Sequence, residues 1–304
     1  MTEQPASART RIAIMNAVHD LPVLVAREEG LFEEEGLAPE FVTTPGMAQV
    51  TTSHSVGWDS VLDRPLDSIY NEGGIDQYRM CEWGIMKRAV EARSQGLRTR
   101  KIVALGASMS TFAIVVGPDS DAYEPEQLKN RAIAVTPNNG SNFTTLKMME
   151  GFLAPEHIRT VNAGSMPKRL EALRRGEVEA VSLMEPWISV AEKQGMRILI
   201  ESHSTRSEAA SDEVDGATLA AMFRAQTRAV RILDADPTPY LRYLVAETGG
   251  LLEPHELRAA RLLHAPPQPY TRERFDDTYR WTVKWNMVVP GATYENTVDN
   301  RAWS

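Results

Sequence analysis

The stretch RAIAVTPNNGSNFTTLKMM, residues 131–149, decides the fold of this chain. Its first five residues form a short apolar run bounded by turn-forming residues, which predicts a buried strand over 131–135. That strand cannot continue, because Pro137 has no backbone N–H to donate and Asn139-Gly140 tolerates a positive φ. Farther on, apolar residues recur at three-residue spacing and predict an amphipathic helix over 141–152. A polar loop therefore joins the end of a strand to the start of a helix.

This loop is suited to holding an anion. A helix N-terminus carries unpaired backbone N–H groups and the positive end of the helix dipole, and both attract negative charge. The alternative is that Ser141 or Asn139 only caps the helix, which needs the same residue types. The candidate ligand contacts in the loop are Asn138, Gly140, Ser141, Asn142 and Phe143.

The rest of the chain repeats the alternation of strand and helix. Strands are predicted at 11–15, 39–42, 77–82, 101–105, 112–116, near 158–161, at 178–183 and at 196–201. Such alternation predicts parallel α/β layers, with the small polar segment 106–111 crossing between lobes. After Ser202 the strands end, and helices are predicted at 217–233, 238–247, 254–263 and 272–288.

The composition excludes several function classes. The 304 residues are 42% hydrophobic and 24% charged, which is ordinary for a soluble globular protein. A formal charge of −8 leaves no basic stripe for nucleic acid. No apolar run approaches the ~18 residues of a membrane span. The first apolar run, of four residues, is too short for the core of a signal peptide, so we expect a cytoplasmic protein.

Cysteine and histidine usage argues against a metal or cofactor. The single cysteine, Cys81, excludes an internal disulfide and a cysteine-based zinc cluster. The sequence has no metal-binding histidine spacing, nucleophile elbow, phosphate-binding loop or dinucleotide fingerprint. We therefore predict no metal site and no cofactor.

Four segments, in this order, resemble the solute-binding proteins of the nitrate, sulfonate, taurine and thiamine-pyrimidine type. They are LPVLVAREEGLFEEEGLAPEFV at 21–42, TPNNGSNFTTLKMM at 136–149, GEVEAVSLMEPW at 176–187 and TYENTVDNRA at 293–302. The resemblance implies an α/β protein with the two-lobed type II periplasmic-binding-protein-like fold and an interlobe cleft. Lobe I would comprise 10–107 plus 206–304, with a helical C-terminal part, and lobe II would comprise 108–205.

The implied cleft lies at the carboxyl ends of the strands, where ligands of α/β proteins bind. The resemblance adds as ligand contacts Asp20, His54, Trp58, Trp83, Met184, Glu185 and Trp187. The three tryptophans would flank a planar or apolar ligand body, although each could equally belong to the core. Asp20 could instead cap the helix that follows it, and Glu185 could serve a helix start.

The segment YRMCEWGIM, residues 78–86, is similar to the corresponding segment of 4,5-dihydroxyphthalate decarboxylases. The chain also resembles desulfinases that act on hydroxybiphenyl sulfinates, but Ala17 stands where their nucleophilic cysteine is expected. Glu82 lies at a strand tip, where a carboxyl group can act as an acid or base, or can cap the next helix. His19, in the first cleft loop, could transfer a proton near neutral pH.

We therefore expect a cytoplasmic enzyme, a decarboxylase-like lyase or a hydrolase, that acts on a small aromatic carboxylate or sulfonate. Glu82 and His19 are its candidate catalytic residues, and no cofactor or cysteine nucleophile is involved. The alternative is a non-catalytic solute-binding protein of an ABC transporter, or a cytosolic ligand sensor. In both cases the partner is a small anionic molecule rather than nucleic acid or membrane, and a homo-oligomer is compatible with the sequence.

Overall fold

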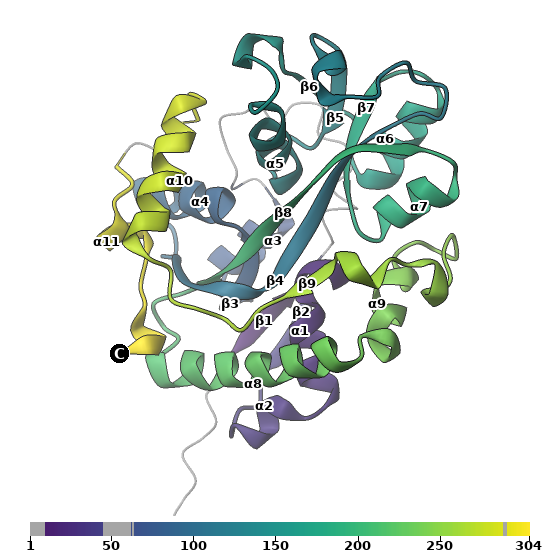
Figure 1. Ribbon diagram of the computed structural model, residues 1–304. Helices are drawn as coiled ribbons and strands as arrows, with labels where there is room; N and C mark the ends of the chain where they lie inside the picture. Colours follow the sequence, from purple (N-terminus) through teal and green to yellow (C-terminus); the bar gives the residue numbers. More distant parts are fainter. Residues whose placement is uncertain (1–9, 45–61, 63, 288–290) are drawn as a thin grey trace, which may run out of the picture.

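The structure is a computed structural model, and it describes residues 10–44, 62, 64–287 and 291–304. Two α/β lobes lie at opposite ends of a pair of long strands, β4 and β8 (Figure 1). Two predicted ligand contacts, His54 and Trp58, lie outside the described residues.

Within the described ranges, one sheet of nine strands runs through both lobes, in the order β2-β1-β3-β8-β4-β7-β5-β6, with β9 paired to β4. The strands are β1 Arg11–Ile14, β2 Glu40–Thr43, β3 Gln77–Cys81, β4 Lys101–Val116, β5 Ala132–Val135, β6 Arg159–Asn162, β7 Ala180–Met184, β8 Arg197–Ala210 and β9 Leu262–His264. Strand β1 is parallel to β2 and β3, and β5 is parallel to β6 and β7. The parallel layers and the two-lobed α/β fold predicted from the sequence are confirmed.

Helices cover this sheet, and they divide between the lobes. In the first lobe lie α1 Ala17–Glu28, α2 Leu31–Glu34, α3 Pro65–Asn71, α4 Glu82–Ser94, α8 Gly216–Ala235, α9 Leu241–Ala246, α10 Arg272–Lys284 and α11 Tyr294–Thr297. In the second lobe lie α5 Gly140–Met149, α6 Met166–Arg174 and α7 Trp187–Lys193. Short 3-10 turns occupy Pro125–Leu128, Pro155–His157, Thr238–Tyr240, Pro254–Glu256, Ala259–Arg261 and Arg301–Trp303. Among the helices described, none is long and apolar enough to cross a membrane.

The two lobes share β4 and β8, which pair with each other in antiparallel fashion from Lys101 to Val116. At one end β8 also pairs with β3, and at the other end β4 also pairs with β7. The sequence predicts two separate strands with a crossing between lobes at 106–111. The break is wrong, because β4 is continuous there, although this part of the strand does pass from one lobe to the other. Small polar residues do not interrupt a strand whose backbone is paired, and a register shift between Leu105 and Met109 absorbs the irregularity. The proposed boundaries at 107/108 and 205/206 thus fall inside these strands.

Two other predicted elements differ from the structure. Residues 16–20, predicted as a loop, hold the first turn of α1, whose cap is Asn16: its side chain accepts from the backbone N–H of His19 at 3.0 Å. The predicted helix over 254–263 is replaced by 3-10 turns and β9, because Leu262–His264 pairs with β4. In both places hydrogen bonds to the surrounding structure decided the outcome, and the local pattern of apolar residues did not.

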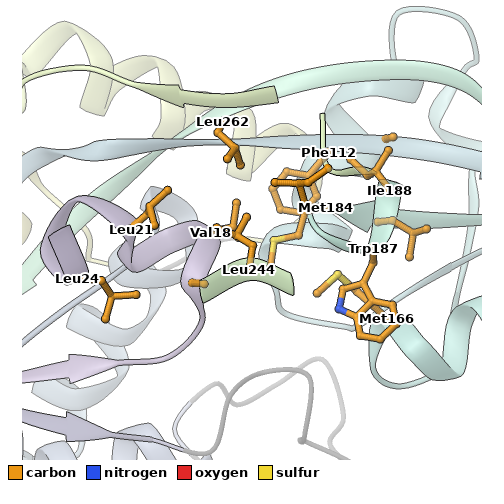
Figure 2. Close-up of a cluster of buried hydrophobic side chains, with 14 of the residues drawn as sticks. Val18, Leu21, Leu24, Phe112, Met166, Met184, Trp187, Ile188, Leu244 and Leu262 are labelled. Atoms are coloured by element: carbon orange, nitrogen blue, oxygen red, sulfur yellow. The ribbon is translucent and has the colours of Figure 1, made fainter. Parts of the chain in front are cut away.

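A hydrophobic core joins the lobes. One cluster of buried side chains contains Val18 and Leu21 of α1, Phe112 of β4, and Met184 and Trp187 of the second lobe. Figure 2 shows these side chains between α1 and the second-lobe helices. Trp187 is therefore part of the core, as the alternative interpretation of that residue held.

The lobes also meet at α10. Glu150, which follows α5, accepts hydrogen bonds from Trp281 Nε1 at 2.8 Å and Trp285 Nε1 at 3.0 Å, and from Lys284 Nζ at 2.7 Å. Beside these contacts, the Trp281 ring lies 5.4 Å from that of Trp83, measured between centroids. We call this group of α10 contacts to Glu150 the interlobe clasp.

Candidate functional site

A small cavity lies between the lobes, beneath the N-terminus of α5. Its walls come from α1, β4, α5, α6, β7 and β8, and they are formed by His19, Phe112, Asn139, Ser141, Met166, Arg169, Met184 and Arg206. The cavity measures ≈ 20 Å³, which is room for about one water molecule. In this conformation the space between the lobes is too small for a larger ligand.

Arg169, on α6, is one of two buried arginines in the cavity wall. Its Nε donates to the carbonyl of Gly164 at 3.0 Å, and Nη2 donates to Thr136 Oγ1 at 2.8 Å. Nη1 donates to the carbonyl of Ser182. None of these partners is a carboxylate, and burial lowers the pKa of Arg169 to about 9. The guanidinium is thus hydrogen-bonded while its charge remains uncompensated.

Arg206, on β8, is the second buried arginine, with 1% of its surface exposed. Among the described residues its guanidinium donates only to the carbonyl of Ser204, from Nε at 3.3 Å and Nη2 at 3.2 Å. A Cβ on Gly140, the first residue of α5, would lie 3.2 Å from Arg206 Nη1. The cation therefore lies against the positive end of a helix. Burial lowers the pKa of Arg206, and the interactions with Cys81 and then Glu82 partly offset this.

The electrostatics of the cavity are one-sided. Two buried cations and a helix N-terminus face the same space, and each of them carries positive charge or potential. Burying a charge without a counter-ion is costly, and like charges add to that cost. An anion in the cavity would relieve both penalties, so the arrangement favours an anionic ligand.

His19 completes the polar wall on the first lobe. Its side chain is 1% exposed, and its Nδ1 lies 2.9 Å from the side-chain nitrogen of Asn16. Its Nε2 is buried and has no hydrogen-bond partner among the described residues. Burial, followed by the charges of Arg206 and Arg79, lowers the pKa of His19 well below 6.5. The imidazole is therefore neutral at physiological pH.

The loop at residues 136–141, between β5 and α5, reaches the cavity through Asn139 and Ser141. Asn139 caps α5 by accepting from the backbone N–H of Ser141 at 3.1 Å. Ser141 Oγ in turn accepts from the backbone N–H of Thr136 at 3.1 Å. Capping and lining of the cavity are therefore compatible roles for the same two residues.

The other predicted contacts in this loop surround the cavity without being part of its wall. Asn138 has a positive φ of 52° and turns the chain into α5. Gly140 permits the approach of Arg206. The side chain of Asn142 is fully buried, and neither of its amide atoms bonds to a described residue. Phe143 packs against Trp83, with 5.7 Å between ring centroids.

Asp20 is held by the protein itself. Its carboxylate accepts from the backbone N–H groups of Met15 at 2.6 Å and Asn16 at 2.9 Å, and it forms an ion pair with Arg79. These contacts brace the strand-to-helix join before α1. Asp20 is not part of the cavity wall, and its predicted contact with ligand has no support in the geometry.

Glu82 begins α4 at the tip of β3, where the sequence predicts it. Its carboxylate accepts from the Tyr270 hydroxyl at 2.5 Å, and from Arg274 Nε at 2.8 Å and Nη2 at 3.1 Å. A carboxylate paired in this way ties α4 to α10. These contacts favour a structural role for Glu82 at the start of α4. They do not favour the alternative, in which Glu82 exchanges protons with a ligand as an acid or base.

Glu185 is likewise engaged inside the protein. It accepts from the backbone N–H of Ser189 at 3.2 Å and from its hydroxyl at 3.1 Å, and from Arg261 Nη1 at 3.2 Å. Burial raises the pKa of Glu185. Of the ligand contacts predicted in the second lobe after β7, Met184 lines the cavity, whereas Glu185 and Trp187 do not.

Sequence reasoning missed both cavity arginines. Arg169 could have been found, because it falls at helical spacing from Met166 and Leu173 and so lies on the apolar face of α6. Arg206 lies in a strand that was predicted to end at residue 201, so its burial gave no signal.

Two further features bear on the choice of site. A larger hollow of ≈ 1000 Å³ lies on the surface of the second lobe, but its charged residues, Asp119, Asp121, Arg174 and Glu179, are all exposed to solvent. Charges in water attract ligands weakly. In the part of the chain that the structure describes, no group of three His, Cys, Asp or Glu residues could hold a metal ion.

The fold and the interlobe cavity define the class of this molecule as periplasmic-binding-protein-like. The chain belongs to the NMT1-like family, whose model matches residues 3–238. A comparison with curated protein sequences finds no match.

Solved structures with the same fold include three anion-binding proteins. The periplasmic aliphatic sulphonate binding protein SsuA of Escherichia coli has a TM-score of 0.70 and 15% identity, over 98% of this chain and 93% of that one. The alkanesulfonate-binding protein SsuA of Xanthomonas axonopodis pv. citri, bound to MOPS, has a TM-score of 0.68 and 16% identity, over 93% and 94%. The periplasmic nitrate-binding protein NrtA of Synechocystis PCC 6803 has a TM-score of 0.69 and 12% identity, over 99% and 88%. At such identities the likeness establishes the fold.

Proposed function

We propose that this protein is a solute-binding protein that holds a small oxoanion between its lobes. The observation that carries the proposal is the pair Arg169 and Arg206, two buried guanidinium groups that line one cavity without a carboxylate partner among the described residues. A nitrate, sulfonate or carboxylate group offers the acceptors and the negative charge that these groups need.

The comparisons support the same class of ligand. The structural neighbours are named as binders of sulfonates and of nitrate. This agrees with the non-catalytic alternative derived from the sequence, whereas the lyase or hydrolase has no supporting contact around Glu82. The cytoplasmic location stays a prediction, and with it the choice between a transporter receptor and a cytosolic sensor.

Binding would proceed by closure of the lobes around the anion. The cavity of ≈ 20 Å³ is too small for an alkanesulfonate, since it holds about one water molecule. The ligand would enter the separated lobes, and its charge would then attract Arg169 and the α5 N-terminus of one lobe towards His19 of the other. Ligand and closure therefore stabilise each other.

Calorimetric titration with nitrate, methanesulfonate, taurine and benzoate tests the proposal. We expect at least one of them to bind, and we expect Arg169→Met and Arg206→Met each to weaken that binding roughly 30-fold or more, because each removes a buried charge partner. The control is Arg197→Met, since Arg197 also donates to backbone carbonyls, of Ser120 and Ala122, but lies outside the cavity.

Two results would overturn the proposal. One is the absence of binding by all four anions. The other is binding that both cavity variants leave unchanged. Proton NMR of the ligand after long incubation distinguishes a binding protein from an enzyme. A binding protein leaves the ligand intact, whereas a new product would indicate catalysis.

A further inference from the structure

We propose that His19 determines the specificity of this site by presenting a fixed N–H donor, so that the site accepts fully deprotonated oxoanions and rejects those that retain an acidic proton. The inference rests on the proposed function, and it concerns the chemical class of the anion. A sulfonate would satisfy the site, whereas a phosphonate monoanion of the same size would not.

Asn16 fixes the position of the ring proton. Its Oδ1 accepts from the backbone N–H of His19 at 3.0 Å, so the amide orientation is set by its role as helix cap. Its Nδ2 then faces His19 Nδ1 at 2.9 Å. An amide NH₂ can only donate, so Nδ1 must accept, and the single proton of the neutral imidazole is on Nε2.

His19 Nε2–H is therefore a buried donor in the cavity wall without an acceptor among the described residues. Leaving such a donor buried and unpaired is energetically unfavourable. A ligand oxygen with a lone pair removes this cost. A ligand O–H placed there would instead bring two donors together.

The cationic groups of the wall are donors as well, and Asn139 Oδ1 is already engaged as the acceptor of the Ser141 N–H. Arg169 and Arg206 have only N–H groups, which cannot accept a proton from a ligand. Ser141 Oγ already accepts the Thr136 N–H and has its own proton to donate. No described carboxylate lines the cavity, so a ligand that retains a proton lacks a strong acceptor for it.

The donor state of His19 does not change over the useful pH range. The charged groups around it are Arg206 of β8, Arg79 of β3 and Arg169 of α6, together with Asp20 of its own helix, which is paired with Arg79. Burial and the neighbouring guanidinium groups keep the pKa of His19 well below 6.5. Arg169, with a pKa of about 9, and Glu247, which accepts from the Ala17 N–H and has a pKa of about 7, do titrate in this range, so the ligand's proton is reported by the difference between two probes that differ only in that proton.

Methanesulfonate and methylphosphonate provide a matched pair of probes. They have nearly the same shape, but methylphosphonate holds one acidic proton at about pH 6 and loses it by about pH 9, as phosphorus oxyacids do. Because the pKa of Arg169 is about 9, methanesulfonate, which holds no proton at either pH, reports any change in the charge of the site itself, and the readout is the ratio of the two affinities at each pH. Methylphosphonate should bind roughly tenfold or more weakly at the lower pH, and it should recover at the higher pH.

His19→Gln tests the assignment, because an amide side chain offers an acceptor as well as a donor. We expect this variant to lose most of the discrimination at about pH 6 by gaining affinity for methylphosphonate. The control is His264→Gln, since His264 on β9 is another largely buried histidine but does not line the cavity. Discrimination retained in His19→Gln would overturn the inference.

A measurement on the unmodified protein keeps the inference testable if His19→Gln fails to fold. Nitrogen-15 NMR of the imidazole should place the proton on Nε2, and a proton on Nδ1 would overturn the inference. The failures remain distinguishable: if neither probe binds at either pH, the proposed function fails. If methanesulfonate binds and methylphosphonate binds equally well at about pH 6, only the role of His19 fails.

Discussion

Arg79, Arg88 and Arg100 of the first lobe are as deeply buried as Arg169 and Arg206 of the cavity, but their partners differ. Arg79 pairs with Asp20 and Glu208, the latter at 3.2 Å. Arg88 and Arg100 share Asp67, at 3.0 Å and 2.7 Å. The cavity arginines donate instead to carbonyl and hydroxyl oxygens.

This difference in hydrogen-bond acceptors separates buried arginines that stabilise the fold from buried arginines that can bind an anionic ligand. A carboxylate satisfies the hydrogen bonds of a guanidinium and cancels its charge. A carbonyl satisfies the hydrogen bonds alone, so the charge remains available to a bound anion. Buried arginines are therefore informative about function only when their counter-ions are counted.

The largest expected effect is on folding, through the paired set. Arg79→Met would leave the carboxylates of Asp20 and Glu208 buried without a cation, so the free energy of unfolding should fall by about 3–5 kcal/mol. Urea unfolding followed by circular dichroism measures the change. A loss below about 1 kcal/mol would mean that the pair does not support the fold.

The unpaired set should respond in the opposite direction. Arg206→Met removes a desolvated charge whose only described hydrogen-bond acceptor is the Ser204 carbonyl, so the ligand-free protein should be equally stable or up to about 1 kcal/mol more stable. Its melting temperature should no longer rise when the anion is added. Destabilisation comparable to that of Arg79→Met would erase the distinction between the two sets.

Buried histidines give a third case, in which burial is tolerated because the group is neutral. The pKa of His19 is well below 6.5, and burial lowers that of His264 to about 4. The unfolded chain therefore binds more protons than the folded one, and stability present above about pH 6.5 is lost on acidification. Each histidine should contribute a slope of up to about 1.4 kcal/mol per pH unit. Urea unfolding between about pH 7 and 4 checks this. His264→Gln should remove the contribution of His264 to the slope of the unfolding free energy against pH.

The smallest effect is expected at the interlobe clasp, where a carboxylate is paired across the lobes. Glu150→Gln weakens its contacts with Lys284 and the two tryptophans, and because Lys284 is half exposed the loss should be within about 1 kcal/mol. The closed state should become less populated, so anion affinity should fall a few-fold while the Arg206 contacts persist. Unchanged affinity would show that the clasp does not influence closure.

Strand and helix order, the two lobes and part of the cavity could be predicted from the sequence. Ser141 and Met184 were among the predicted ligand contacts and His19 was a predicted catalytic residue, because ends of strands and helix N-termini are visible as local patterns. The engagement of Asp20 and Glu82 was not visible, since their partners Arg79 and Arg274 lie 59 and 192 residues away.

The continuous strands β4 and β8 could not be anticipated either. Composition along 106–111 indicated a loop, whereas pairing between residues about a hundred positions apart made it a strand. Long-range pairing of this kind overrides the local preference of small and polar residues. The same extension of β8 buried Arg206, so the error in the strand and the missed site residue had one cause.

The register shift of β4 against β8, between Leu105 and Met109, has a mechanical consequence. Two strands that pass through both lobes resist stretching and sliding, while a bulge locally increases the twist of the pair. Motion of one lobe against the other would therefore be a twist of this ribbon rather than a rotation about a flexible linker. The amide hydrogens of Gly106 and Ala107, which lie inside the shift, should exchange faster than those of the flanking pairs.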